Sequence, residues 1–135
     1  MRFLVVEDES IIAQDVCWVI ENLLSFSVAG ATATSGEALK MIASETVDAV
    51  VLDANLEDGT SEAVATELKR RHIPYFVLSG SIEQNSLPAP LDCGPMLAKP
   101  YLENDLISEI KRLADAAVRS ERPDNAMRSR LTPAG

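Results

Sequence analysis

Short, continuously apolar runs alternate along the chain with longer segments in which apolar residues recur at helical spacing. Three of these runs are rich in β-forming residues: Phe3–Val6, Ala49–Leu52 and Tyr75–Leu78. Continuous hydrophobicity is typical of strands that are covered on both faces, as in a parallel sheet. Two weaker strands are expected at Ser27–Ala33 and Met96–Ala98.

Amphipathic helices are predicted between these strands, because apolar side chains there repeat every three or four residues. A capping box at Thr34 and Glu37 opens the second helix, which is expected to run through Glu45. The third helix is expected at Thr60–Arg71. The predicted buried stripes are Ile12, Val16, Val19 and Leu23 in the first helix, Val64 and Leu68 in the third, and Leu106, Ile110, Leu113 and Ala117 in the last.

The resulting order of elements is βαβαβαβ, a break, and then βα. This order predicts an α/β fold with a doubly wound five-stranded parallel sheet, in the flavodoxin-like strand order 2-1-3-4-5. The break between Gly80 and Pro95 is rich in proline and glycine and has no helical stripe. We therefore expect the fourth helix to be shortened or replaced by a loop, with at most a short turn around Ile82–Ser86.

Periodicity is lost beyond about Arg119, so residues 1–119 are predicted to form the folded domain and residues 120–135 a mostly disordered tail. A chain of 135 residues has room for one such domain. The acidic Glu7 comes too early for a signal peptide, and no apolar run approaches the ~18 residues of a membrane span. We expect a cytoplasmic protein in which Cys17 and Cys93 are packing residues in a reducing compartment.

The formal net charge is −9, from 21 acidic and 12 basic residues. Such a surface repels the phosphates of nucleic acid, so direct nucleic-acid binding is not expected. The same balance is compatible with a site that gathers carboxylates around a cation.

Polar residues stand where four of the predicted strands end. Ligands of a doubly wound sheet bind at the carboxyl edge of the strands, so these residues are expected to converge. They are Glu7 and Asp8 after the first strand, Asp53 after the third, Ser79 after the fourth and Lys99 after the fifth. Carboxylates held close together repel one another unless a divalent cation neutralises them, and oxygen ligands suit Mg²⁺.

These residue types fit phosphoryl transfer to a carboxylate. Asp53 is the candidate nucleophile that forms an acyl phosphate, with Mg²⁺ shielding its charge. Lys99 supplies positive charge beside the transferred group. Ser79 offers a hydroxyl that can contact a phosphoryl oxygen once one is present, which is a differential contact of the kind that a switch needs.

Each of these residues has an ordinary structural interpretation when it is taken alone. An Asp after a strand often caps a helix, a Ser at a strand end is usually a turn residue, and a Lys before a proline is usually solvated. The sequence Glu7-Asp8-Glu9 is compatible with a simple acidic loop. What these interpretations leave unexplained is the joint occurrence of the set, with each member at the end of a separate strand.

The chain from Arg2 to about Val118 resembles the CheY-like receiver family of response regulators. The resemblance rests on Phe3-Leu4-Val5-Val6-Glu7-Asp8-Glu9-Ser10, on Val51-Leu52-Asp53-Ala54-Asn55-Leu56, on Ser79, and on Lys99-Pro100-Tyr101. It implies that Asp53 is the phosphoacceptor and that Asp8, Asp53 and the backbone carbonyl of Asn55 ligate Mg²⁺. It also implies that Glu7 acts through water and that the peptide bond before Pro100 is cis.

Three positions depart from the commonest family pattern. Glu7 stands where Asp is usual, Glu57 stands where Pro often occurs, and Met96 replaces the usual switch aromatic three residues before Lys99. An aromatic–hydroxyl rotation is therefore not the expected readout. Four stretches resemble an atypical subgroup, the single-domain "FAT GUY" receivers of alphaproteobacteria: Asp53-Ala54-Asn55-Leu56, Ile73-Pro74-Tyr75-Phe76-Val77-Leu78-Ser79-Gly80, Leu87-Pro88 and Pro95-Met96-Leu97-Ala98-Lys99-Pro100. Receivers of this subgroup are often paired with kinases of the HWE or a related type.

Ile11, Gln14 and Trp18 are predicted to share one face of the first helix, roughly opposite its buried stripe. One interpretation is that this face docks the histidine domain of the phosphodonor, as the same helix does in related receivers. The other is that Trp18 folds over a neighbouring loop or the last helix. Met96 and the altered loop belong to a face that many receivers use to form homodimers, so a homodimer is an open alternative to a monomer.

The sequence thus predicts a two-component receiver that accepts a phosphoryl group from a sensor histidine kinase or phosphotransfer protein and then changes its binding to an unidentified protein target. It is not expected to be an enzyme with a separate substrate. The first rival, an aspartyl phosphatase of the haloacid dehalogenase class, would need an acid where Asn55 stands. The others are a degenerate receiver that acts by protein contact alone and a flavin-binding module, which would need a phosphate-cradling loop after the first strand.

Overall fold

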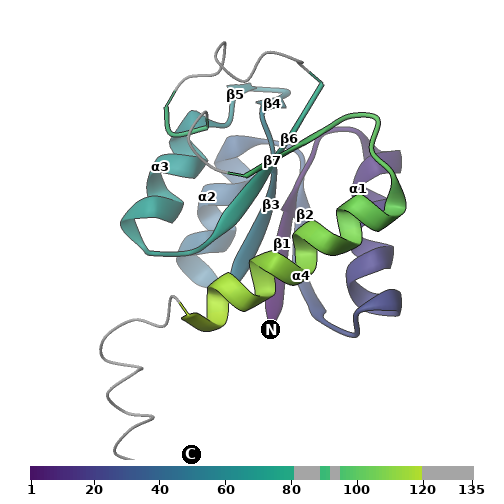
Figure 1. The fold of residues 1–135 in the computed structure, drawn as a ribbon. Coiled ribbons are helices and arrows are strands. Elements are labelled where there is room, and N and C mark those ends of the chain that lie inside the picture. Colours follow the sequence, from purple (N-terminus) through teal and green to yellow (C-terminus); the bar gives the residue numbers. More distant parts are fainter. Residues whose placement is uncertain (81–88, 92–94, 120–135) are drawn as a thin grey trace, which may run out of the picture.

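The computed structural model describes residues 1–80, 89–91 and 95–119. Its main sheet has five parallel strands, in the order β2-β1-β3-β6-β7. They are β1 (Arg2–Val6), β2 (Ser27–Thr32), β3 (Ala49–Asp53), β6 (Tyr75–Ser79) and β7 (Met96–Ala98) (Figure 1). Counted along the main sheet, this is the predicted order 2-1-3-4-5, and the predicted fold class is confirmed.

Helices cover both faces of this sheet (Figure 1). They are α1 (Ser10–Trp18), which continues as the π-helical turn η1 (Val19–Leu23), α2 (Ser35–Ser44), α3 (Glu62–Arg70) and α4 (Glu103–Arg119). Side chains of α1 and α4 share one core cluster with Phe3 and Val51, whereas side chains of α2 and α3 share the other with Leu4 and Leu52. Because successive side chains of a strand point to opposite faces, the buried strands serve both clusters.

The first helix departs from the predicted stripe at its end. Val16 and Val19 are buried as predicted, but Leu23 is 43 % exposed and Ile20 is buried in its place. The cause is the π-helical turn, in which the amide of Leu24 donates to the carbonyl of Val19, five residues earlier, at 3.2 Å. Ile20 lies four residues after the buried Val16 and so stays on the buried face, whereas the wider turn carries Leu23 away from the sheet.

The second helix begins as predicted, because the Thr34 hydroxyl accepts a hydrogen bond from the amide of Glu37 at 3.2 Å. The Glu37 carboxylate in turn accepts from the Thr34 hydroxyl at 3.2 Å. The last helix buries Leu106, Ile110 and Leu113 as predicted. Ala114 completes its stripe, while Ala117 is partly buried.

The third helix starts at Glu62, two residues later than predicted. The reason is a small antiparallel hairpin, formed by β4 (Asn55–Leu56) and β5 (Gly59–Thr60), which takes up the chain directly after Asp53 (Figure 1). Gly59 has a φ of 119°, a backbone conformation that side-chain-bearing residues rarely adopt. Val64 and Leu68 of α3 are buried as predicted.

Several predictions concern residues outside the described part of the chain. These are the altered fourth helix with its short turn at Ile82–Ser86, the packing role of Cys93, and the tail at residues 120–135. Among the helices that the structure describes, none is both long enough and apolar enough to cross a lipid bilayer.

Candidate functional site

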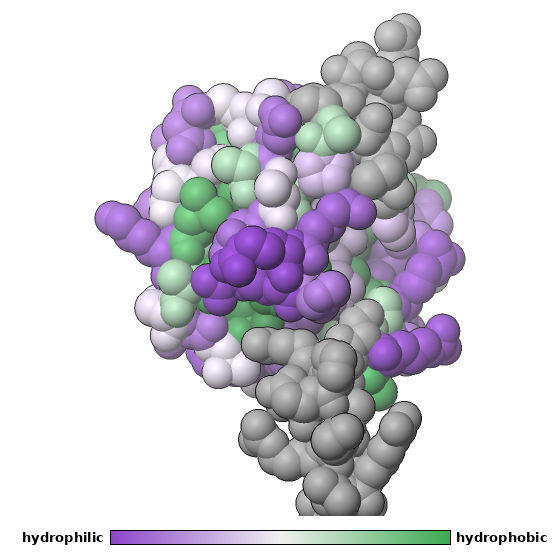
Figure 2. Space-filling view, turned by 90° about the vertical axis from the view of Figure 1, so that its left-hand side faces the viewer, coloured by the Kyte–Doolittle hydropathy of each residue, from purple (hydrophilic) through white to green (hydrophobic). Residues whose placement is uncertain are grey.

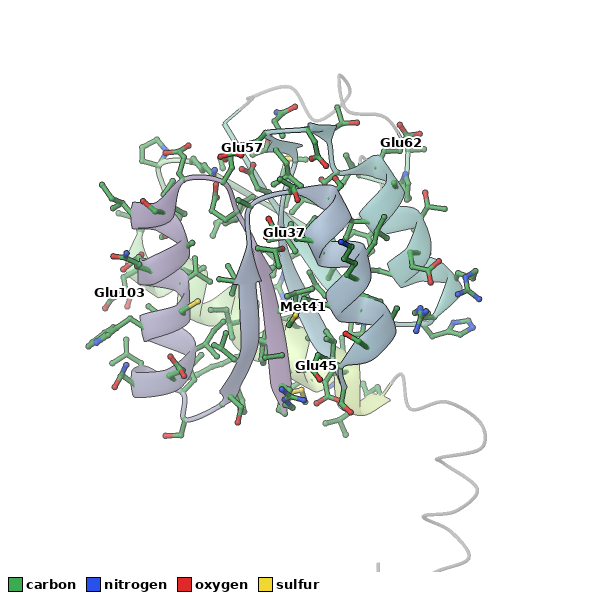
Figure 3. All side chains as sticks on the ribbon, turned by 180° about the vertical axis from the view of Figure 1, so that it is seen from behind. Glu37, Met41, Glu45, Glu57, Glu62 and Glu103 are labelled. Carbon is green, nitrogen blue, oxygen red and sulfur yellow. The ribbon has the colours of Figure 1, made fainter. Side chains whose placement is uncertain are left out.

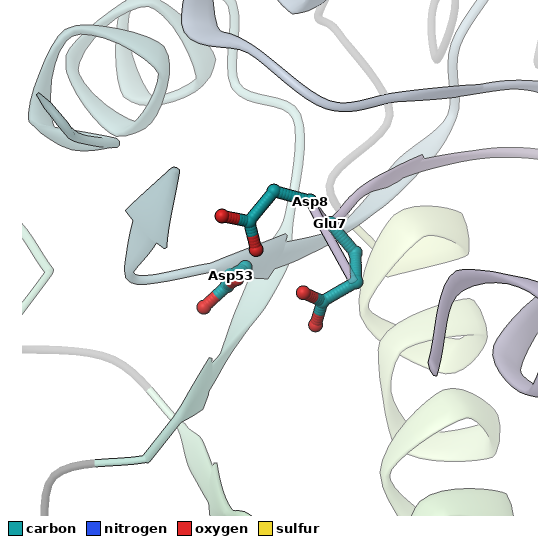
Figure 4. A group of neighbouring side chains, drawn as sticks. All are labelled: Glu7, Asp8 and Asp53. Atoms are coloured by element: carbon teal, nitrogen blue, oxygen red, sulfur yellow. The ribbon is translucent and has the colours of Figure 1, made fainter. Parts of the chain in front are cut away.

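Three carboxylates converge at the carboxyl edge of the two central strands (Figure 4). Glu7 and Asp8 follow β1, and Asp53 is the last residue of β3. The two strands are paired directly, with Val6 opposite Leu52, so their ends coincide. One carboxylate oxygen from each of the three residues lies within 4.8 Å of those of the other two. The sequence prediction that Glu7, Asp8 and Asp53 meet is therefore confirmed.

Lys99 brings one positive charge to this group from the end of β7. Its Nζ lies 2.7 Å from Glu7 Oε1 and 3.4 Å from Asp53 Oδ2. The exposed Glu9 carboxylate approaches the same Nζ at 3.6 Å. The Lys99 amide donates to the carbonyl of Ser79 at 2.9 Å, which fixes the start of the lysine loop against β6.

Two of the three carboxylates are largely out of solvent, because Glu7 is 3 % exposed and Asp53 is 4 % exposed, whereas Asp8 is half-buried. Burial is the main cause of a pKa of Asp53 that is raised to about 8, and the hydrogen bond and negative charge of Glu7 add to it. The charge of Lys99 and the hydrogen bond from the Asn55 amide act in the opposite direction and do not compensate. The site therefore disfavours the full set of negative charges.

Lys99 remains charged in this surrounding. Burial by itself would lower the pKa of Lys99, but the hydrogen bond to Glu7 and the charges of Asp53, Glu7 and Glu9 raise it above its ordinary value. The ammonium is thus a positive charge that faces Glu7, Asp53 and the exposed Glu9.

The loop after Asp53 is anchored at both of its ends. The amide of Asn55 donates to Asp53 Oδ1 at 3.3 Å. The amide and the hydroxyl of Ser61 both donate to the carbonyl of Ala54, at 3.0 and 3.2 Å. Ser61 is fully buried and was not predicted from the sequence, where its neighbours carry no spacing signal for such a contact.

Ser79 is fully buried at the end of β6, opposite Ala98 of β7 and next to the lysine loop. The peptide bond between Lys99 and Pro100 is cis, as the family resemblance implies. A second contact was not predicted: the Tyr101 hydroxyl donates to Asp15 Oδ2 on α1 at 2.7 Å. Burial and this hydrogen bond raise the pKa of Tyr101, so the hydroxyl keeps its proton.

The predicted partner residues of α1 lie on the surface. Ile11 is 81 % exposed, Trp18 is 51 % exposed, and Gln14 is exposed between them. About half of Trp18 is thus accessible, and its role as a docking residue stays a prediction. The α3 side of the molecule differs from this partly apolar surface of α1: Figure 2 shows strongly hydrophilic residues at the centre of that face. Met96, the fourth predicted partner residue, is half-buried against the core cluster of α2 and α3.

The residues of the site fit a hard divalent cation. Three carboxylates face one ammonium, and their oxygen atoms are grouped closely enough to share one ion. Oxygen ligands of this kind are those that Mg²⁺ prefers. The pKa of Asp53 agrees with this fit, because burial first and the neighbouring Glu7 second raise it, and the charge of Lys99 does not offset them.

Comparison with known proteins gives consistent matches over most of the chain. The sequence profile of the response regulator receiver domain matches residues 3–111. The transcriptional regulatory protein PrrA of Mycobacterium tuberculosis is 35% identical over 120 residues, which cover 83% of this chain and 49% of that protein. Protein MrkE of Klebsiella pneumoniae is 25% identical over 118 residues, covering 86% of this chain and 44% of that protein. The chain thus spans about half the length of these curated relatives.

Solved structures show the same fold. The response regulatory domain of MrkE superimposes with a TM-score of 0.76 at 24% identity and covers 88% of this chain and 99% of that one. SdrG from Sphingomonas melonis Fr1 gives a TM-score of 0.69 at 27% identity, with 87% and 96% covered. The similarity therefore extends over the part of the chain that carries the acidic site.

Proposed function

Because the chain belongs to the response regulator receiver domain family, a module of two-component signalling, we propose that it accepts a phosphoryl group on Asp53 in the presence of Mg²⁺. The donor is a sensor histidine kinase or a phosphotransfer protein. The observation that carries this proposal is the convergence of three carboxylates within 4.8 Å of one another, beside the ammonium of Lys99.

Asp8, Asp53 and the backbone carbonyl of Asn55 would hold the Mg²⁺ ion, with Glu7 acting through water. The ion supplies positive charge that favours the ionised Asp53 and offsets the charge of the incoming phosphoryl group. Glu7 keeps Lys99 in place through the 2.7 Å ion pair. Asn55 orients the nucleophile, because its amide holds Asp53 Oδ1.

In the transfer step, a carboxylate oxygen of Asp53 forms a bond to phosphorus while the bond between phosphorus and the donor's imidazole nitrogen breaks. The electron pair of that bond stays on the imidazole, which takes a proton from solvent. Lys99 Nζ, already 3.4 Å from Asp53 Oδ2, is placed to pair with an oxygen of the transferred group. The protein modifies itself once in this reaction and turns over no separate substrate.

The readout proposed for this reaction is a contact that exists only in the phosphorylated state. A phosphoryl oxygen gives the buried hydroxyl of Ser79 a new acceptor beside the lysine loop. A contact made in one state and absent in the other shifts the equilibrium between two conformations. Binding to the downstream protein would change with it.

The proposal is tested by intact mass after incubation with Mg²⁺ and phosphoramidate. Wild type should gain one phosphoryl group, the gain should disappear in EDTA, and Asp53→Asn should show none. Asp105→Asn, which changes an exposed aspartate at the start of α4, is the matched control and should react like wild type. An adduct that forms without Mg²⁺ or persists in Asp53→Asn would contradict the proposal. A protein that neither reacts nor binds Mg²⁺ would be the contact-only receiver.

The exposed face of Ile11, Gln14 and Trp18 is proposed as the docking surface for the histidine donor. We expect Trp18→Ala to slow transfer from a phosphorylated histidine phosphotransfer domain while leaving the phosphoramidate reaction intact. An equal loss with both donors would exclude this role. The FAT GUY subgroup, the HWE-type kinase, the cytoplasmic location and a homodimer through the face that contains Met96 stay predictions.

A further inference from the structure

The turn of the small hairpin that follows Asp53 is hydrogen-bonded to the N-terminus of α2. Asp58 lies in that turn, between β4 and β5. Its Oδ1 accepts a hydrogen bond from the amide of Ser35 at 3.0 Å, and its Oδ2 accepts one from the amide of Gly36 at 3.3 Å. Figure 3 shows the hairpin, marked by Glu57, beyond the end of α2 that carries Glu37.

These two contacts complete the N-terminus of α2. The first amides of a helix have no partner within the helix and need acceptors from elsewhere. Thr34 accepts from Glu37, the third residue of α2, and Asp58 accepts from the first two. The cap of α2 is therefore shared between the residue before the helix and a carboxylate more than twenty positions further along the chain. The backbone hydrogen bond from Ser35 lowers the pKa of Asp58, so this carboxylate stays ionised.

The other end of the same hairpin belongs to the proposed metal site. Asn55, whose carbonyl is a proposed Mg²⁺ ligand, is the first residue of β4 and pairs with Thr60. Only one further pair, Leu56 with Gly59, completes the hairpin. Two-stranded ribbons of this size have little stability of their own, so the position of Asn55 depends on what anchors the hairpin. Ser61 anchors its base, and Asp58 anchors its turn.

We propose that Asp58 is a positioning residue for the metal site, because it ties the hairpin to the first turn of α2 and thereby holds the Asn55 carbonyl in place for the cation. This inference rests on the proposed Mg²⁺-dependent function. It has a reciprocal consequence. If the tether favours the arrangement that binds the cation, then the bound cation must favour the tether by the same factor.

The first experiment measures Mg²⁺ binding by titration calorimetry in the absence of any phosphodonor. Asp58→Ala should weaken Mg²⁺ binding about threefold to tenfold, the range expected when a helix-capping carboxylate is lost. Glu57→Ala is the matched control, because it removes the same charge from the same exposed turn without removing the tether. It should weaken binding by less than about twofold, the effect of one distant surface charge in salt. Asp58→Asn keeps one acceptor oxygen and should lie between the two.

The second experiment follows the exchange of the Ser35 and Gly36 amides by NMR. Mg²⁺ should slow their exchange in wild type and in Glu57→Ala, and this response should vanish in Asp58→Ala. A residue that merely stabilised α2 would give equal exchange with and without Mg²⁺. Thermal unfolding of each variant checks that it is folded at the temperature used.

The outcomes separate this inference from the function on which it rests. If wild type binds no Mg²⁺, the proposed function fails. If wild type binds Mg²⁺ and Asp58→Ala binds it equally well, or no more weakly than Glu57→Ala does, the function stands and the positioning role of Asp58 is wrong.

Discussion

Two groups of charged residues in this protein contain the same kinds of side chain but differ in burial and in how far their charges balance. At the carboxyl edge of the sheet, Glu7 and Asp53 are buried and share Lys99. On the exposed side of α3, Glu67 pairs with Arg70 at 2.7 Å and also with Arg71. Both are clusters of carboxylates and cations, but they differ in burial and in the balance of charge.

Burial and the balance of charge together decide the protonation of the acids. Two guanidinium groups surround one carboxylate on α3, and their hydrogen bonds lower the pKa of Glu67 to about 2. At the sheet edge the carboxylates outnumber the ammonium, and burial beside Glu7 raises the pKa of Asp53 to about 8. In the α3 cluster the negative charge of Glu67 is fully paired with arginine. The carboxylates of the edge cluster are not fully paired, and such an uncompensated group is typical of a site that awaits a ligand.

The largest effect on stability is expected from removing the charge of Lys99, the cation that pairs with the edge cluster among the described residues. Lys99→Met leaves the fully buried side chain of Glu7 without its partner. We expect a loss of about 2–4 kcal/mol in the free energy of unfolding, slightly below the range for fully buried pairs because Lys99 keeps 12 % of its side chain exposed. Urea unfolding measures it, with the exposed Lys111→Met as control. Equal stability of the two variants would contradict the account.

The second-largest effect is a dependence of folding stability on pH. Its sign is opposite to that of a carboxylate in an ordinary salt bridge. Folded Asp53 holds its proton up to about pH 8, whereas the unfolded chain releases it near the ordinary value of 3.8. The folded state therefore binds more protons between these values, and stability falls as pH rises, by at most about 1.4 kcal/mol per pH unit.

Thermal unfolding in EDTA between pH 5 and pH 8 tests this dependence. The midpoint of wild type should fall across the range, and the slope should flatten in Asp53→Asn. Saturating Mg²⁺ should also reduce the slope, because the cation favours the ionised carboxylate. A wild-type slope that Asp53→Asn leaves unchanged would show that another group is responsible.

The smallest effect is expected from the surface cluster. Arg70→Ala removes a side chain that is largely exposed, and Glu67 keeps Arg71 as a partner. Solvent and salt screen such pairs, so no measurable change in unfolding is expected at physiological ionic strength. Urea unfolding at low and high salt checks this. A loss as large as that of Lys99→Met would remove the distinction between the two clusters.

The strands of the main sheet were predictable because burial on both faces leaves a continuous apolar run, as in Ala49–Leu52. The hairpin of β4 and β5 was not, since strands of two residues have no period to detect. Leu23 was wrongly placed in the core for a related reason. A helical stripe assumes a constant turn, and the π-helical turn of η1 breaks that assumption without a mark in the sequence.

The core of the site was predictable from strand ends alone. Once the sheet is parallel, Asp8, Asp53 and Lys99 must reach the same edge, however far apart they are in the chain. Contacts between elements were not predictable in this way. Two examples are the hydrogen bond from Tyr101 to Asp15 and the cap that Asp58 provides to α2. Both depend on how helices and loops pack, and no local spacing of residues encodes that packing.

The proposed function requires that a divalent cation balance the buried negative charge around Asp53. The most direct test is the carboxyl-carbon NMR titration of Asp53, with and without Mg²⁺. The account predicts a midpoint near pH 8 in the absence of the ion and a fall of roughly one unit or more when Mg²⁺ is saturating. A midpoint near the ordinary value of 3.8 that does not respond to Mg²⁺ would contradict it.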